Sequence, residues 1–167
     1  MKYQGLIVMT ALLALGGCGG SDDDNSAVTP PTPEPTYVSI NDATSLKVSV
    51  DGVDAVTKAI TFSLSTDAGV AVTDAGANYS VMYLNFPEEQ VSAFSIPWHN
   101  GVRFTCSEGN DCSGTLAATE TAGQYLFTPG SLEKLGDATG QLKLAINIAG
   151  TLAQAQTGLV EPPAPKG

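Results

Sequence analysis

The sequence predicts an all-β fold: a single Greek-key β-sandwich or split barrel of the Ig-like kind. Apolar and polar residues alternate with a period of two in "SLKVSV" (45–50), "AITFSLS" (59–65) and "QLKLAINI" (141–148). Such alternation is typical of strands that bury one face. Turn-forming residues separate the apolar segments, at Asp51-Gly52, Asp67-Ala68-Gly69, Asp74-Ala75-Gly76, Asn100-Gly101, Gly109-Asn110 and Pro129-Gly130. No long helical period follows the N-terminal segment.

The remaining elements complete one domain. Further strands are expected at residues 79–85, 94–97, 102–106, 115–118 and 124–128, with one helical turn at 131–136. Seven or eight short strands in about 120 residues are enough to bury a core in one sandwich. We therefore expect a single β domain over residues 37–158, followed by a flexible C-terminal tail over 159–167.

The N-terminal segment has the pattern of an export signal. Lys2 precedes an apolar run, 6–15, that is too short to span a bilayer. The run ends in Leu15-Gly16-Gly17-Cys18, the pattern of a bacterial lipobox, although an ordinary Sec signal that contains a cysteine is the alternative. We expect residues 1–17 to be a lipoprotein signal peptide and Cys18 to carry the lipid, palmitate included. Gly19 follows instead of Asp, which favours the outer membrane of diderm bacteria, on its periplasmic or extracellular face.

Residues 18–36 have the composition of a disordered tether. The segment combines an acidic run, Asp22-Asp23-Asp24, with four prolines at positions 30, 31, 33 and 35. The acidic run lacks the spaced ligands and terminal Glu of a calcium loop. The whole chain has a formal net charge of -10 and scattered basic residues. This balance excludes a nucleic-acid partner, because that affinity needs clustered Lys and Arg.

A cysteine pair stands in "FTCSEGNDCSG", at Cys106 and Cys112. A thioredoxin-like site needs C-x-x-C at a helix start, zinc needs more Cys or His ligands, and covalent haem needs C-x-x-C-H. None of these patterns is present. An exported chain meets an oxidising compartment, so we expect a structural disulfide. A labile, redox-active disulfide is the alternative.

"IPWHNG" joins the single Trp, Trp98, to the single His, His99, and is a second candidate for binding. Trp98 as a packing residue and His99 as a solvent-exposed one are the alternatives. His99 has no Ser, Cys or carboxylate motif as a partner, so no catalytic arrangement is indicated. Glu88 and Glu89 are adjacent and point to opposite sides of an extended chain. We expect no enzymatic activity, no metal and no cofactor.

These features together resemble a known family. A lipobox with "GGSDDD", alternating strands, Trp98, a C-x5-C loop and "GQYLFTP" are similar to the N-terminal β domain of the outer-membrane decahaem c-type cytochromes. The matching positions are Cys18, Trp98, the Cys106–Cys112 pair and Gly123 to Tyr125. The resemblance implies a Greek-key split barrel, a role in extracellular electron transfer and a disulfide linked to flavin docking. The family's haems attach at C-x-x-C-H, which this sequence does not contain.

The sequence therefore leads to three functional hypotheses. The first is a non-catalytic outer-membrane lipoprotein that presents its β-sandwich for binding or assembly at the cell surface, with a surface cytochrome or outer-membrane complex as partner. The second is an accessory or truncated N-terminal domain of a multihaem cytochrome system. The third is an adhesin or carbohydrate-binding module. The third hypothesis needs an exposed aromatic platform. The candidates for such a platform are Tyr79, Tyr83, Trp98 and Tyr125, and we expect them to point inward.

Overall fold

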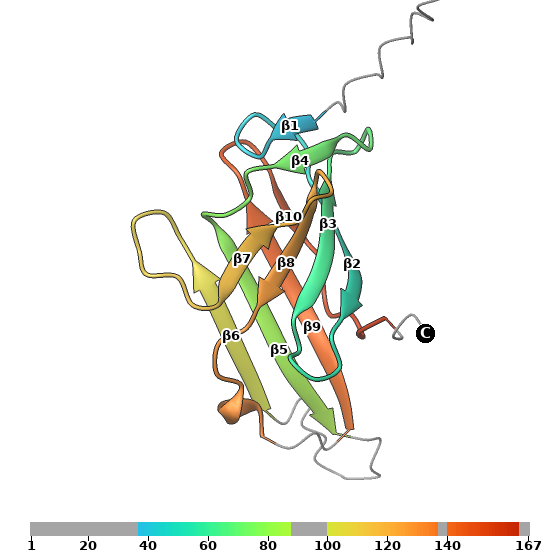
Figure 1. Ribbon diagram of the computed structural model, residues 1–167, viewed down its shortest axis with the longest axis vertical. Coiled ribbons are helices and arrows are strands. Elements are labelled where there is room, and N and C mark those ends of the chain that lie inside the picture. Colours follow the sequence, from blue (N-terminus) through green and yellow to red (C-terminus); the bar gives the residue numbers. More distant parts are fainter. Residues whose placement is uncertain (1–36, 88–99, 137–139, 164–167) are drawn as a thin grey trace, which may run out of the picture. The chain divides into compact units, whose positions relative to one another are not determined.

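The computed structural model describes residues 37–87, 100–136 and 140–163 (Figure 1). In chain order the elements are β1 (Tyr37–Ser39), β2 (Lys47–Val53), β3 (Ile60–Ser65), β4 (Ala71–Thr73), β5 (Tyr79–Pro87), β6 (Asn100–Cys106), β7 (Thr115–Ala118), β8 (Gln124–Thr128), the 3-10 turn η1 (Glu133–Leu135), β9 (Gly140–Ala149) and β10 (Gln154–Gln156). No helix in this part of the chain is long and apolar enough to cross a membrane.

The strands form two sheets, which confirms the predicted β-sandwich. One sheet has the order β1-β4-β3-β8-β7, with β2 also paired to β3; the other has the order β10-β9-β5-β6. All pairings are antiparallel except that of β1 with β4. Figure 1 shows the β3–β8–β7 sheet lying over the β9–β5–β6 sheet. The chain crosses between them after β4, β6 and β8, so non-sequential strands become neighbours, as in Greek-key sandwiches.

The core lies between the sheets and uses the faces that the alternation predicts. Ile60, Phe62 and Leu64 of β3 are buried, and so are Leu144, Ile146 and Ile148 of β9. The aromatic side chains join the two layers around one ring, Phe127 of β8. It lies 5.7 Å from the ring of Tyr79, 6.4 Å from that of Tyr83 and 5.7 Å from that of Phe104, measured between centroids. Since all three neighbours belong to the opposite sheet, Phe127 is the main aromatic contact between the layers.

The predicted Asp51-Gly52 turn is wrong. These residues lie inside β2, where the register with β3 shifts between Val50 and Gly52 in a β-bulge. The reversal comes later, over residues 54–59, where the Asp54 carboxylate accepts hydrogen bonds from the backbone N–H of Val56 and Thr57. These bonds lower the pKa of Asp54. An Asx-type turn closes this hairpin, and it carries no glycine that would have revealed it.

The predicted Asn100-Gly101 turn is also wrong, because both residues begin β6 and pair with Asn85 and Leu84 of β5. A Cβ on Gly101 would stand 2.8 Å from Leu84 Cδ2. The glycine therefore makes room for a cross-strand leucine. The strand expected at 94–97 lies outside the described residues.

Three short strands were not predicted: β1, β4 and β10. Each has three residues, too few to show a period. The expected turn at 131–136 is present as η1. Beyond β10 the backbone of Val160, in the segment expected to be a tail, exchanges two hydrogen bonds of 2.8 Å with Leu144. The domain limits remain a prediction.

Candidate functional site

Cys106 and Cys112 form a disulfide that closes the loop between β6 and β7, with their Cα atoms 4.3 Å apart. Cys106 is buried at the end of β6, while Cys112 is exposed. Between them the Asn110 backbone N–H donates to the Ser107 carbonyl, with Gly109 at φ +79°. The predicted disulfide is therefore present; it bridges the ends of a loop that contains a tight turn, and it joins that loop to the core.

Residues of β5 and β6 hold this loop in place. The Tyr79 hydroxyl, from β5, lies 3.0 Å from the Ser113 carbonyl oxygen and 3.2 Å from that of Gly114. The Ser113 backbone N–H donates to the Thr105 carbonyl, and the Ser113 hydroxyl accepts from the Thr105 N–H. Burial raises the pKa of Tyr79, so its hydroxyl stays protonated as a donor. The loop backbone is thus fixed at both sides of the disulfide.

A second tyrosine fixes the adjacent loop between β4 and β5. The Tyr125 hydroxyl, from β8, donates to the Val72 carbonyl at 2.9 Å and accepts from the Ala75 N–H at 3.2 Å. Burial is the main cause of its raised pKa. Gly123, two residues earlier, has φ +76°, and a Cβ there would stand 2.8 Å from the Leu64 carbonyl oxygen. In the "GQY" segment, the glycine therefore allows the backbone to approach Leu64 closely, and the tyrosine hydroxyl fixes the β4–β5 loop by two hydrogen bonds.

A cleft of about 280 Å³ lies at this end of the sandwich, with a mainly polar lining. Four connections contribute to it: the segments after β1, between β4 and β5, between β6 and β7, and between β9 and β10. The lining residues are Ile40, Asn41, Asp74, Ala75, Ala77, Asn78, Glu108, Ala149, Gly150 and Thr151. We call it the loop cleft.

Hydrogen bonds between the four segments shape the loop cleft. The Glu108 N–H donates to Asn78 Oδ1 at 3.1 Å, which connects the disulfide loop to the β4–β5 connection. The Thr151 hydroxyl donates to Asn41 Oδ1 at 3.0 Å, which connects the β9–β10 turn to the segment after β1. Two carboxylates, Asp74 and Glu108, line the cleft, and none of the lining residues that the structure describes is basic. Such a surface offers mainly acceptors to a polar ligand.

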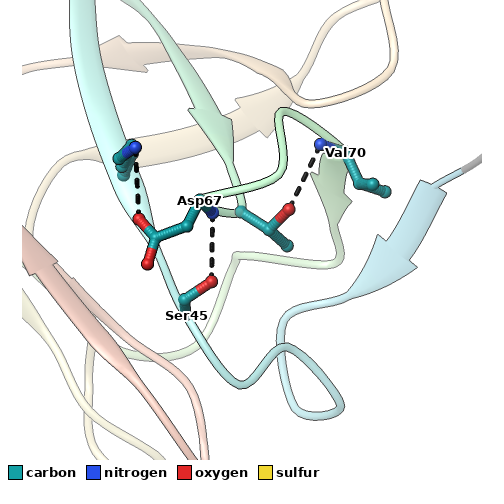
Figure 2. A network of polar contacts seen from close by, with 5 residues as sticks. Ser45, Asp67 and Val70 are labelled. Carbon is teal, nitrogen blue, oxygen red and sulfur yellow. Dashed lines mark hydrogen bonds and ion pairs between the residues drawn. The ribbon is translucent and has the colours of Figure 1, made fainter.

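A second concavity of about 490 Å³ lies between the edge strands β2 and β10, one from each sheet. We call it the edge groove; its lining residues are Leu46, Lys47, Val48, Ser49, Ser63, Ser65, Gln154, Ala155 and Gln156. The β3–β4 turn is fixed against β2 beside it. The Asp67 N–H donates to Ser45 Oγ (Figure 2), and the Val70 N–H donates to the Thr66 hydroxyl. The Asp67 carboxylate also lies 3.2 Å from Lys47 Nζ.

The structure places the sequence-predicted site residues unevenly. The cysteine pair borders the loop cleft through Glu108. Cys18, Trp98 and His99 lie outside the described residues, as do Glu88 and Glu89. Tyr79, Tyr83 and Tyr125 are at most 5% exposed, so these three aromatic candidates point inward as expected. Within residues 37–87, 100–136 and 140–163, no three His, Cys, Asp or Glu side chains are grouped to hold a metal ion.

Sequence reasoning missed the loop cleft. Its polar residues lie in four separate turns, and only the strand order brings those turns to one end. The available signal was local: Asp74 begins a predicted turn, Asn78 follows that turn, and Glu108 stands between the cysteines.

Comparisons with known proteins do not assign a family. Neither a protein-family model nor a curated protein sequence matches the chain. Among solved structures, the outer membrane decahaem cytochrome OmcA is similar, with a TM-score of 0.44 and 16% identity. The match covers 72% of this chain and 23% of that cytochrome. A likeness this weak does not extend beyond a general similarity of fold.

Proposed function

We propose that this protein is a non-catalytic, lipid-anchored module that binds a partner at the outer membrane through the loop cleft. The observation that carries the proposal is the construction of that cleft. Four connections form one polar surface, and a disulfide and two buried tyrosine hydroxyls hold it rigid. Loops on a rigid sandwich are the usual binding surface of this architecture. The proposal includes no cofactor and no metal.

The lipid anchor is supported by the lipobox at Cys18 and by the acidic, proline-rich segment that follows. Export also agrees with a disulfide between Cys106 and Cys112. Labelled palmitate should be incorporated into the wild-type chain and not into Cys18→Ser. Equal labelling of the two proteins would refute the lipid anchor and would leave the proposal about the loop cleft unaffected.

Binding through the loop cleft is tested by photo-crosslinking on intact cells. A photoreactive residue at Glu108 should give a discrete adduct with a surface protein, because this side chain lines the cleft. The matched control is the same residue at Glu133, an exposed glutamate of η1 outside the cleft lining. Adducts of equal yield and size at both positions, or none at Glu108, would argue against the cleft as the binding surface.

An accessory role in a multihaem cytochrome system is the second candidate. It is supported by the sequence resemblance, whose Cys106–Cys112 and Gly123-Gln124-Tyr125 positions both shape the loop-cleft end of the sandwich. Under this candidate the partner crosslinked at Glu108 contains c-type haem, and the adduct stains for haem peroxidase activity. A haem-free partner would leave the general binding role and exclude the cytochrome one.

A further inference from the structure

The free edge of β2 is a second surface with the properties of an interface. Among the described strands, β2 pairs with β3 alone, and its other edge faces the edge groove. The inward-facing Leu46, Val48 and Val50 are only half-buried, although Phe62 and Leu64 beside them on β3 are at most 1% exposed. An open strand edge beside half-covered apolar side chains is suited to an added strand.

The order of side chains on β2 indicates which kind of strand can be added to its free edge. Lys47 and Ser49 share the outer face of the sheet with Asp51, while Val48 and Val50 face the core. Consider two copies of β2 placed antiparallel and centred on Ser49. Lys47 then lies opposite Asp51 of the second copy, Val48 lies opposite Val50, and the two-fold axis repeats both pairs. A shift of one residue would put charged side chains on the apolar face.

We propose that the protein forms a two-fold dimer in which the β2 edges pair antiparallel, centred on Ser49, and join the two sheets that contain β2. The occupant of this edge is a second copy because its charges are complementary there at both ends. The same charges deter other strands: a lysine on an edge opposes pairing unless the incoming strand brings a carboxylate to it.

Both charged groups lie on the outer face of the sheet, and each already has a partner within the chain. Lys47 is held by Asp67 through an ion pair whose side chains are 63% and 68% exposed, an arrangement of little stabilising value. Asp51 uses one oxygen, Oδ2, to accept from the Ser63 hydroxyl at 2.6 Å and from Gln124 Nε2 at 3.2 Å. These bonds hold the carboxylate on the outer face. The bulge after Val50 keeps the paired stretch short, so we expect a reversible dimer.

Charge reversal tests the proposal with the full-length protein in mild detergent. Lys47→Glu places two carboxylates opposite each other at both ends of the interface, and Asp51→Lys places two ammonium groups there. Each variant alone should dimerise roughly 10-fold or more weakly than wild type, since two attractive cross-strand pairs become repulsive. An equimolar mixture restores two complementary pairs and should form a heterodimer. Dimerisation is measured by sedimentation at about 0.15 M salt, because this salt concentration screens the long-range repulsion between two acidic chains.

Two controls separate the register from general effects of charge. Lys134→Glu and Asp42→Lys change the net charge equally at exposed positions outside β2 and should leave dimerisation unchanged. Ser49→Cys should form a disulfide-linked dimer on mild oxidation, whereas Thr128→Cys, exposed on β8, should not. A wild type that stays monomeric at all concentrations, single reversals without effect, or a mixture no more dimeric than its components would each overturn the proposal.

Discussion

Tyr83 connects the core to the turn between β2 and β3, and its hydroxyl can be removed with little change of shape. The side chain is 0% exposed, and the hydroxyl donates to the Lys58 carbonyl at 2.7 Å. Tyr83→Phe removes the donor and leaves the Lys58 carbonyl without this hydrogen bond. The expected loss is about 1–2 kcal/mol of unfolding free energy near pH 8, the usual cost of such a deletion.

The same substitution should change how stability depends on pH. Burial raises the pKa of Tyr83 well above the value of about 10 that it has in the unfolded chain. Above pH 10 the unfolded chain loses this proton while the folded chain keeps it, so stability falls as pH rises. At pH 11 the wild type should have lost about 1.4 kcal/mol through this group, and the Phe variant none. The difference between the two proteins should therefore approach zero at pH 11.

Urea unfolding followed by circular dichroism at pH 8 and pH 11 measures both quantities. Tyr37→Phe is the matched control, because Tyr37 is 58% exposed and should behave as wild type at both pH values. Tyr79 and Tyr125 are present in every protein and cancel in the comparison. A difference between wild type and Tyr83→Phe that stays constant from pH 8 to pH 11 would refute the argument.

Three further outcomes are expected from equilibrium unfolding. Replacing Cys106 and Cys112 together by Ser should cost about 2 kcal/mol on the loop-entropy model, and reduction of the wild type should cost the same; no loss would mean that the bond does not restrict the unfolded chain as this model assumes. Gly123→Ala should destabilise by about 1–3 kcal/mol because of its positive φ and a nearby carbonyl, whereas Gly76→Ala, in open space, should be close to neutral. Lys58→Gly should stabilise by about 0.5–1 kcal/mol, since Lys58 has φ +59°; a loss there would mean that the Lys58 side chain contributes more than the backbone strain costs.

The sequence predicts the long strands well because each of them buries one face. In β3 and β9 the alternating residues coincide with the buried ones, so periodicity and burial report the same fact. The prediction fails where a turn signal serves another purpose. Asp51-Gly52 forms a bulge and Gly101 accommodates Leu84, both inside strands. A glycine or aspartate in the sequence marks a position with a special backbone requirement. It does not distinguish a turn from a bulge or from a close cross-strand contact.

The candidate site was less predictable than the fold. The disulfide follows from two cysteines in a turn-forming segment, a local property. The loop cleft depends on which ends of the strands are neighbours, and pairings such as β3 with β8 set that order. Asn41 and Thr151 contact each other only because those pairings bring their segments together. Periodicity in one sequence does not contain this information.

The central pair of the second sheet has a consequence for when the protein can fold. β5 pairs along its whole length with β9, and the chain between them supplies β6, β7 and β8. The second sheet therefore cannot be completed until almost the entire domain has emerged, and a chain dominated by such distant pairings folds on the slow side, in milliseconds to seconds. The Cys106–Cys112 loop is local by contrast and can close early. We therefore expect this loop to close under oxidising conditions before the two sheets are complete.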